Sequence, residues 1–273
     1  ELEALFTPEH GFTGDREGKI ADTNLNGVPV YSLYGERTMP KDEQLAGVDT
    51  IVFDLQDVGV RFYTYASTMK RAMKVAADRH LRFVVLDRPN PIGGVDVQGP
   101  VLEPTGGAPS LKNIVNHHAL PVRHGMTMGE LAQLFAADDH IDVSPHILKL
   151  AGWRRLDTFL TAGLSWTALS PTLRSLKSVA LYPAVGLLES TNISVGRGTD
   201  MPFEIVAAPW LDANALKSKL EGTPATAGLS FSITEVTPKS SVHANKKCQA
   251  LKIAIVDARR FEPVRQLGAA HHP

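Results

Sequence analysis

The sequence predicts an α/β fold built on a largely parallel sheet, and three observations lead to this prediction. Short apolar runs at 51–53 and 83–86 are typical of buried strands. A segment with helical spacing lies between them, so strand, helix and strand follow one another as in a βαβ unit, with helices on the faces of the sheet. Each strand-like run also ends in a polar cluster, and ligands of such sheets bind beyond the carboxyl ends of the strands.

The strands are expected at 4–6, 28–33, 51–53 and 83–86, with a short helix over 40–46. From about Ser67 the spacing predicts a helix whose charged residues Lys70, Arg71, Lys74 and Asp78 lie away from the apolar face. That apolar face carries Met69, Ala72, Met73 and Ala76.

Residues 95–119 are rich in Gly and Pro and are expected to form a loop. A helix then runs to about Ala137, with Thr127 as its N-cap and Glu130 completing a capping box.

The pattern changes near Ser144, where Pro and Gly recur and residues 231–236 and 251–256 alternate as strands do. We therefore predict two domains, an α/β domain over 1–145 and a smaller α+β domain over 146–273. The second domain contains a polar segment at 182–199.

Composition narrows the range of functions. The 273 residues contain 28 Lys and Arg against 29 Asp and Glu, with no run of like charge, so a nucleic-acid or anionic-membrane surface is not expected. The single cysteine, Cys248, excludes an internal disulfide framework. No stretch is apolar enough to span a bilayer. We therefore expect the protein to bind a small or neutral ligand. The chain begins at Glu1 without Met, and we expect it to be part of a longer product.

Four predicted strand exits carry polar clusters, at 9–10, 34–37, 54–65 and 87–90. If the strands are parallel, these clusters share one edge of the sheet. Glu9 and His10 stand between Pro8 and Gly11, which suits a catalytic carboxyl on a rigid turn, and the alternative is a solvated turn.

Asp54 and Asp57 follow the predicted strand at 51–53 and resemble a paired-acid arrangement. Their spacing disfavours an aspartyl-phosphate phosphatase, and a metal site would need more oxygen ligands than can be placed here. The structural alternative is that Asp54 pairs with Arg61 and holds the loop.

The remaining clusters have equally plain alternatives. Asn90 lies between two prolines and suits recognition of a hydroxyl or acetamido group, or else forms an Asx turn. Arg123 and His124 precede a capped helix and could bind an anion there. In the second domain, Glu189 and Asn192 are polar groups available to a ligand, whereas 196–199 lacks the phosphate-loop pattern.

Five motifs occur together in order: Pro8–Gly11, Asp54–Tyr65, Asp87–Pro91, Arg123–Thr127 and Thr191–Thr199. This set resembles the DUF1343 (YbbC-like) family, which is associated with exo-acting β-N-acetylmuramidases of the NamZ type. The resemblance covers nearly the whole chain. It implies a Rossmann-like domain whose first sheet elements are missing here, an auxiliary domain, and an active site in the cleft between them.

The resemblance further implies release of terminal N-acetylmuramic acid from peptidoglycan fragments, with Glu9 as the catalytic glutamate, no cofactor and no metal. Members act outside the cytoplasm, as secreted, periplasmic or lipoprotein forms; nothing indicates an oligomeric state. In this interpretation Glu9 protonates the glycosidic oxygen, and Asp54 or Asp57 steadies the oxocarbenium-like centre or activates water. The residues expected to contact the sugar are His10, Arg61, Tyr63, Tyr65, Asp87, Asn90, His124, Glu189, Asn192 and Arg197.

Two alternatives remain open at this point, a non-catalytic muropeptide-binding protein and a metal-dependent hydrolase. One departure from the family pattern concerns specificity. Many members have Pro-Ser-Pro-Asn where this chain has Leu169-Ser170-Pro171-Thr172, and a glycine where Ala184 stands.

Overall fold

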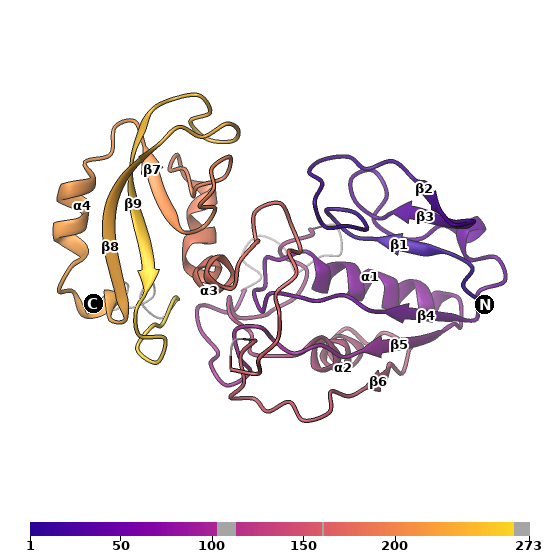
Figure 1. Ribbon diagram of the computed structural model, residues 1–273. Coiled ribbons are helices and arrows are strands. Elements are labelled where there is room, and N and C mark those ends of the chain that lie inside the picture. The colour runs from indigo at the N-terminus through magenta and orange to yellow at the C-terminus, as the bar shows by residue number, and fades with distance from the viewer. Residues whose placement is uncertain (103–112, 160, 265–273) are drawn as a thin grey trace. The chain divides into compact units, whose positions relative to one another are not determined.

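The computed structural model describes residues 1–102, 113–159 and 161–264, and the chain divides into two compact units (Figure 1). The first unit comprises Glu1–Val97 and Val101–Pro171, and the second comprises Gln98–Pro100 and Thr172–Pro273. The division after Pro171 comes later than the boundary expected after residue 145. The reason is that β6 (His146–Leu148) pairs in parallel with β5 (Arg82–Leu86), and that the segment after β6 also bonds to the first unit, through the backbone carbonyls of Arg155 and Leu169.

The first unit contains a three-stranded parallel sheet of order β4-β5-β6, in which β4 spans Thr50–Phe53. Helix α1 (Tyr65–Asp78) connects β4 to β5, which confirms the predicted βαβ unit. Side chains alternate across the strands, so the register of Ile51 opposite Phe83 places both on one face.

A second three-stranded sheet has the order β1-β3-β2. Strand β1 (Leu5–Thr7) runs parallel to β3 (Val28–Ser32), and the exposed β2 (Thr23–Leu25) is antiparallel to β3. Within the described residues no ladder joins this sheet to β4-β5-β6, so the four predicted strand exits do not lie along one continuous hydrogen-bonded edge. The expectation of a single parallel sheet is corrected to two, of which one is mixed.

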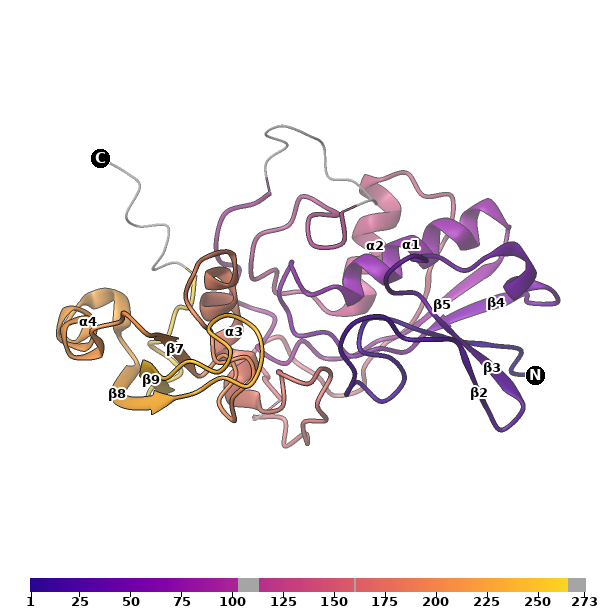
Figure 2. The ribbon, with the colours of Figure 1, turned by 90° about the horizontal axis from the view of Figure 1, so that it is seen from above.

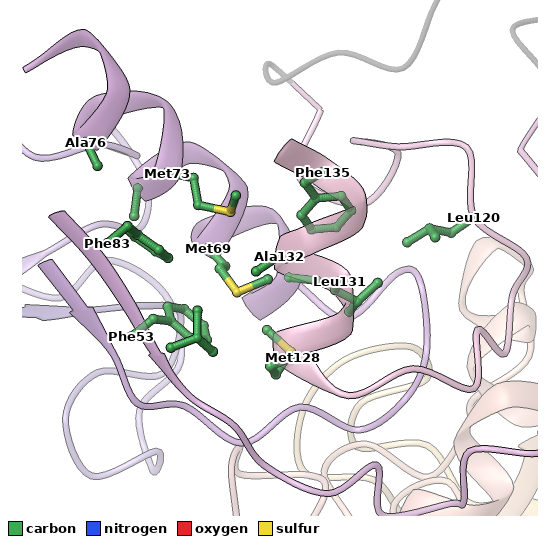
Figure 3. Packing of buried hydrophobic residues seen from close by; sticks show 13 residues of the cluster. Phe53, Met69, Met73, Ala76, Phe83, Leu120, Met128, Leu131, Ala132 and Phe135 are labelled. Atoms are coloured by element: carbon green, nitrogen blue, oxygen red, sulfur yellow. The ribbon is translucent and has the colours of Figure 1, made fainter. Parts of the chain in front are cut away.

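The core of the first unit lies between β4-β5-β6 and the two helices α1 and α2 (Met128–Asp138) (Figures 1 and 2). Figure 3 shows Met69 and Met73 of α1 beside Phe53, Phe83 and α2. Burial of large apolar side chains such as these is the main favourable term in folding. The predicted buried face of α1 is confirmed, since its members Met69, Ala72, Met73 and Ala76 are all buried.

Two of the charged residues that were expected away from this face, Lys70 and Arg71, are buried as well. Lys70 Nζ donates to the carbonyl of His117 at 2.7 Å and forms an ion pair with Asp139. The segment around His117 and the C-terminal end of α2, which carries Asp139, therefore supply the acceptors that a buried ammonium group needs.

Both helices pack on the same face of the sheet, because side chains of both belong to the cluster that contains Phe53, Phe83 and Val85. On the other face, Val52 and Leu148 are 54% and 50% exposed. This sheet and the two helices thus form two layers, and neither α1 nor α2 covers the sheet face that carries Val52 and Leu148.

The predicted capping box of α2 is confirmed. Glu130 N donates to Thr127 Oγ1 at 3.2 Å, and Thr127 N donates to Glu130 Oε2 at 3.1 Å. The expected helix at 40–46 is a short 3-10 helix, η1 (Asp42–Leu45). Outside residues 103–112, which are not described, the predicted loop at 95–119 contains no helix or strand.

The second unit is built on an antiparallel sheet of order β7-β9-β8. Its strands are β7 (Ile205–Ala208), β8 (Leu229–Val236) and β9 (Cys248–Ile255), so both strands predicted here are confirmed. Helix α4 (Ala213–Leu220) contacts β8 and β9. The other elements are α3 (Leu176–Val185), η2 (Gly186–Ser190) and η3 (Pro224–Thr226). Across the described residues of both units, no helix combines the length and apolarity that a membrane span requires.

Candidate active site

Glu9 lies on a tight turn directly after β1. Gly11 N donates to the carbonyl of Pro8 at 3.2 Å, and both His10 and Gly11 have positive φ, at 75° and 74°. A positive φ at a histidine costs conformational energy, and such strain is concentrated at functional sites. His10 Nδ1 donates to the carbonyl of Arg16 at 2.9 Å, so the His10 ring helps to hold the turn.

The Glu9 carboxylate is held by a threonine that the sequence did not single out as a site residue. Thr64 Oγ1 donates to Glu9 Oε2 at 2.8 Å. Thr64 is the N-cap residue of α1, yet its side chain makes no capping hydrogen bond. The hydroxyl that would normally cap the helix serves Glu9 instead. The carboxylate also lies beside the N-terminus of α1, where the helix dipole favours a negative charge.

Two buried tyrosines support the same turn. The Tyr65 hydroxyl lies 3.1 Å from the Glu9 carbonyl and 3.0 Å from the Leu169 carbonyl, and its proton is donated to these two acceptors. Tyr63 donates to the Leu169 carbonyl at 3.4 Å, and the two tyrosine rings are 4.7 Å apart. Both side chains therefore act as supports of the turn. The sequence marked Leu169 only as a departure from the family pattern and did not indicate this contact, because Leu169 contributes a backbone carbonyl and lies 104 residues after Tyr65.

The electrostatics of Tyr65 connect Glu9 with a second carboxylate. Burial raises the pKa of Tyr65 to about 12; a hydrogen bond with Tyr63 opposes this shift, and the negative charges of Glu9 and Asp57 add to it. Glu9 and Asp57 thus act on the same phenol. The structure therefore places these two predicted catalytic residues close enough to Tyr65 for both of their charges to raise its pKa.

Asp57 is 4% exposed and sits in the loop after β4. Gly59 N donates to Asp57 Oδ1 at 2.7 Å, and His124 Nε2 lies 3.8 Å from the same oxygen. Within the described residues, Asp57 Oδ2 has no hydrogen-bond partner. A buried carboxylate oxygen without a partner is costly, and such atoms are often kept for a ligand or for chemistry.

Asp54 has a different environment. Its carboxylate forms an ion pair with Arg88, whose Nε donates at 2.8 Å, and both side chains are nearly half exposed. The structural alternative considered for Asp54 paired it with Arg61, whereas the observed partner is Arg88. Of the two neighbouring acids, Asp57 is buried near Glu9 and Asp54 is neutralised at the surface.

Asp87 and Asn90 bind the protein's own backbone. Asp87 accepts from Gly129 N at 2.7 Å and from Thr127 Oγ1 at 3.0 Å, so it caps α2. Asn90 is 3% exposed; its amide donates to the Met126 carbonyl at 3.1 Å and accepts from Ile92 N at 3.1 Å. With both ends of its amide engaged, Asn90 fits the Asx-turn alternative better than sugar recognition.

Gly59 is required where Asn90 approaches the Asp57 loop. Its φ is +80°, and a Cβ at this position would lie 2.9 Å from Asn90 Nδ2. Arg61, two residues on, directs its guanidinium to the Leu120 carbonyl, and burial lowers the pKa of Arg61. These contacts fix the loop that carries Asp57.

The candidates in the second unit form their own cluster. Arg197 pairs with Glu189, donates to Thr172 Oγ1 at 3.3 Å and lies over the ring of Phe203 at 5.2 Å. The backbone carbonyl of Asn192 accepts from His243 Nε2 at 2.8 Å, while Asn192 itself is exposed. A ligand role for these three residues stays a prediction.

The described residues contain no group of three or more His, Cys, Asp or Glu side chains arranged to hold a metal ion. Fold and site together define an α/β protein with a carboxylate pair, Glu9 and Asp57, at the ends of two strands of its first unit.

Comparison with known families identifies this protein class more closely. The family described as exo-β-N-acetylmuramidase NamZ matches the chain twice, with its N-terminal part over residues 1–177 and its C-terminal part over residues 180–270. The chain belongs to this family, and the resemblance stated from the five motifs is confirmed.

Individual relatives agree with this assignment. The chain is 41% identical over 270 residues to the peptidoglycan β-N-acetylmuramidase NamZ of Bacillus subtilis (strain 168); the match covers 97% of this chain and 64% of that protein. Two crystal structures of DUF1343 family proteins from Bacteroides fragilis are similar. One has a TM-score of 0.85 at 35% identity and covers 97% of this chain and 68% of its own. The other has a TM-score of 0.66 at 29% identity; the match covers 93% of this chain and 64% of that protein. The chain therefore spans about two thirds of the length of these relatives.

Proposed function

We propose that this chain is a glycoside hydrolase that releases terminal N-acetylmuramic acid from the non-reducing end of peptidoglycan fragments. The observation that carries the proposal is the placement of the Glu9 carboxylate. Thr64 holds it on a strained turn, and its negative charge and that of buried Asp57 both act on the hydroxyl of Tyr65. Membership of the NamZ family and the name of the Bacillus subtilis relative support the substrate class. An extracytoplasmic site of action, expected from the resemblance, belongs to the same proposal.

In the proposed mechanism Glu9 is the general acid that protonates the glycosidic oxygen. Thr64 holds Oε2, which leaves Oε1 to face the leaving group. Asp57 is the second carboxylate, which either stabilises the oxocarbenium-like centre or activates water. We assign this role to Asp57 because Asp54 is already neutralised by Arg88 at the surface, whereas Asp57 retains an unsatisfied oxygen.

The test is Glu9→Gln in the 273-residue chain, assayed with a chromogenic N-acetylmuramide. Gln keeps the acceptor for Thr64 but carries no proton to transfer, so kcat is expected to fall about 100- to 10 000-fold. The matched control is Glu3→Gln, an exposed carboxylate of the same N-terminal segment, which should keep full activity. If Glu9→Gln keeps full activity at an unchanged melting temperature, the assignment of Glu9 as the general acid is wrong.

Product analysis separates this proposal from its rivals. A defined muropeptide should lose N-acetylmuramic acid from its non-reducing end, in the presence or absence of EDTA. Binding of the muropeptide by calorimetry without any product would identify a sugar-binding protein instead. Loss of turnover in EDTA that is restored by a divalent cation would identify a metal-dependent hydrolase.

A further inference from the structure

His124 was expected to contact the sugar, but the structure buries it. Its side chain is 1% exposed, in the segment just before α2. Met126 N donates to His124 Nδ1 at 3.2 Å. A ring nitrogen that accepts a hydrogen bond carries no proton, so the proton of the neutral imidazole lies on Nε2.

The protonated nitrogen faces Asp57. His124 Nε2 lies 3.8 Å from Asp57 Oδ1, which is too long for a formed hydrogen bond but close enough for electrostatic attraction in a buried site. Among the described residues, neither His124 Nε2 nor Asp57 Oδ2 has a hydrogen-bond partner. A buried donor and a buried carboxylate therefore stand next to each other, and each lacks a full set of partners.

Backbone contacts hold the two residues in this relation. Val60 and Arg123 form an antiparallel bridge, and Arg61 N donates to the Val122 carbonyl at 2.9 Å. His124 N donates to the Gly59 carbonyl at 3.4 Å, while Gly59 N holds Asp57 Oδ1. The loop that carries Asp57 and the segment that carries His124 thus form one small two-stranded unit, which suits precise placement of a side chain.

We propose that His124 is a positioning residue for Asp57. Its Nε2–H, together with Gly59 N–H, directs Oδ1 into the protein, so that Oδ2 is the oxygen presented to the reacting sugar or to water. In this role His124 orients the carboxylate and transfers no proton. This inference rests on the proposed function for the role of Asp57, whereas the tautomer and the contact follow from the geometry alone.

Two isosteric substitutions separate the two ends of the imidazole. In His124→Asn, the side-chain oxygen can replace Nδ1 as acceptor for Met126 N, but nothing replaces Nε2. In His124→Gln, the amide can reach the position of Nε2 and donate to Asp57, but the acceptor for Met126 N is lost. If His124 positions Asp57, Asn should lower kcat about 100-fold with little change in KM, and Gln should stay within about tenfold of wild type.

A purely structural role predicts a different order. If the only role of His124 is to accept the hydrogen bond from Met126 N, then His124→Asn should lower the melting temperature less than His124→Gln does. Both variants should then keep the wild-type kcat per folded molecule. That outcome overturns the proposal. A double-mutant cycle adds a second measurement. In an Asp57→Asn background, His124→Asn should lower kcat hardly any further, because His124 acts through Asp57. Additive losses contradict the inference.

The tautomer provides a readout that does not depend on activity. Nitrogen-15 NMR of the imidazoles, assigned with the His124→Gln variant, should show the His124 proton on Nε2. A proton on Nδ1 overturns the inference whatever the enzyme does. Conversely, if Glu9→Gln proves fully active while His124 carries its proton on Nε2, the proposed function fails and the geometric part of the inference stands.

Discussion

At the scale of single residues, the most informative contact is the one between Thr64 and Glu9. A threonine at a helix N-cap normally accepts a hydrogen bond from the helix backbone, which is worth about 1 kcal/mol. Thr64 makes no such bond and donates to Glu9 Oε2 instead. The helix thus gives up one cap interaction, and the carboxylate gains a fixed orientation.

Thr64→Val tests this contact with an isosteric change. Valine keeps the shape of the side chain but cannot donate to Glu9. Glu9 becomes charged as it gives its proton to the glycosidic oxygen, and a hydrogen bond to a charged group is worth about 1.5–3 kcal/mol. We expect kcat for a chromogenic N-acetylmuramide to fall about 10- to 100-fold. Thr64→Ser, which keeps the hydroxyl, is the control and should stay near wild type. Equal activity of the Val and Ser variants would show that the contact plays no part in catalysis.

At the scale of elements, the N-terminus of α2 shows how a predicted site residue takes a structural role. The sequence correctly predicted the capping box of Thr127 and Glu130. It also suggested Asp87 as a sugar contact, but the Asp87 carboxylate accepts from Gly129 N and from Thr127 Oγ1. Asp87 thereby connects the end of β5 to the start of α2, where a negative charge is favourable.

The corresponding prediction concerns stability. Asp87→Ala removes the acceptors for α2 and is expected to lower the free energy of unfolding by about 2 kcal/mol, with Asp87→Asn losing about half as much. Urea unfolding followed by circular dichroism measures this loss, and kcat per folded molecule should stay unchanged. The control is Asp78→Ala, an exposed acid in the last turn of α1, which should change stability by less than about 0.5 kcal/mol. A raised KM at unchanged stability would restore Asp87 as a substrate contact.

At the scale of the whole molecule, the stability of the first unit depends on a buried histidine. His117 is fully buried, and among the described residues neither of its ring nitrogens has a hydrogen-bond partner. Burial lowers the pKa of His117 from 6.5 to about 3, and the positive charge of Lys70 adds to the effect. Between these two pH values the unfolded chain binds more protons than the folded chain, so stability falls as the pH falls. The contribution is complete above pH 6.5 and is lost towards pH 3.

We therefore expect His117→Leu to reduce the acid sensitivity of the protein. Below about pH 6, wild type should lose about 1.4 kcal/mol per pH unit relative to this variant, because one proton separates the two states. At pH 7 the variant should be at least as stable, since leucine leaves no polar atom unsatisfied. Urea unfolding at pH 7, 6, 5 and 4 measures the difference. His146→Leu, at an exposed histidine of β6, is the control, and parallel pH dependences for His117→Leu and wild type would contradict the prediction.

Most local structure was predictable. Strands β1, β3, β4, β5, β8 and β9 and helices α1 and α2 were predicted from apolar runs, periodicity and caps. Strand β6 was missed because it has three residues and exposed ends, and β2 because it is exposed throughout. The division after Pro171 followed from the pairing of β6 and from the bonds of Arg155 and Leu169 to the first unit, and no local pattern in the sequence indicates these contacts.

The candidate site was predictable only as a set of residues. The sequence named Glu9, Asp57 and Tyr65, but it could not distinguish Asp57 from Asp54, which stand three residues apart in the same motif. Their difference depends on Arg88, which pairs with Asp54, and on Gly59 and His124, which approach Asp57. Arg88 and His124 are distant in the sequence, so their approach follows from packing.

By itself the sequence determined the family, the α/β class and the strand exits that carry carboxylates, because each depends on motifs or on periodicity within a few residues. Only the tertiary structure decided which acid is buried, that Lys70 is covered, and that Thr64 and the Leu169 carbonyl complete the Glu9 turn. These contacts join residues 55 and 104 positions apart. Burial and hydrogen-bond geometry arise when such distant segments pack against each other, and the periodicity of one segment contains no information about the segment that will cover it.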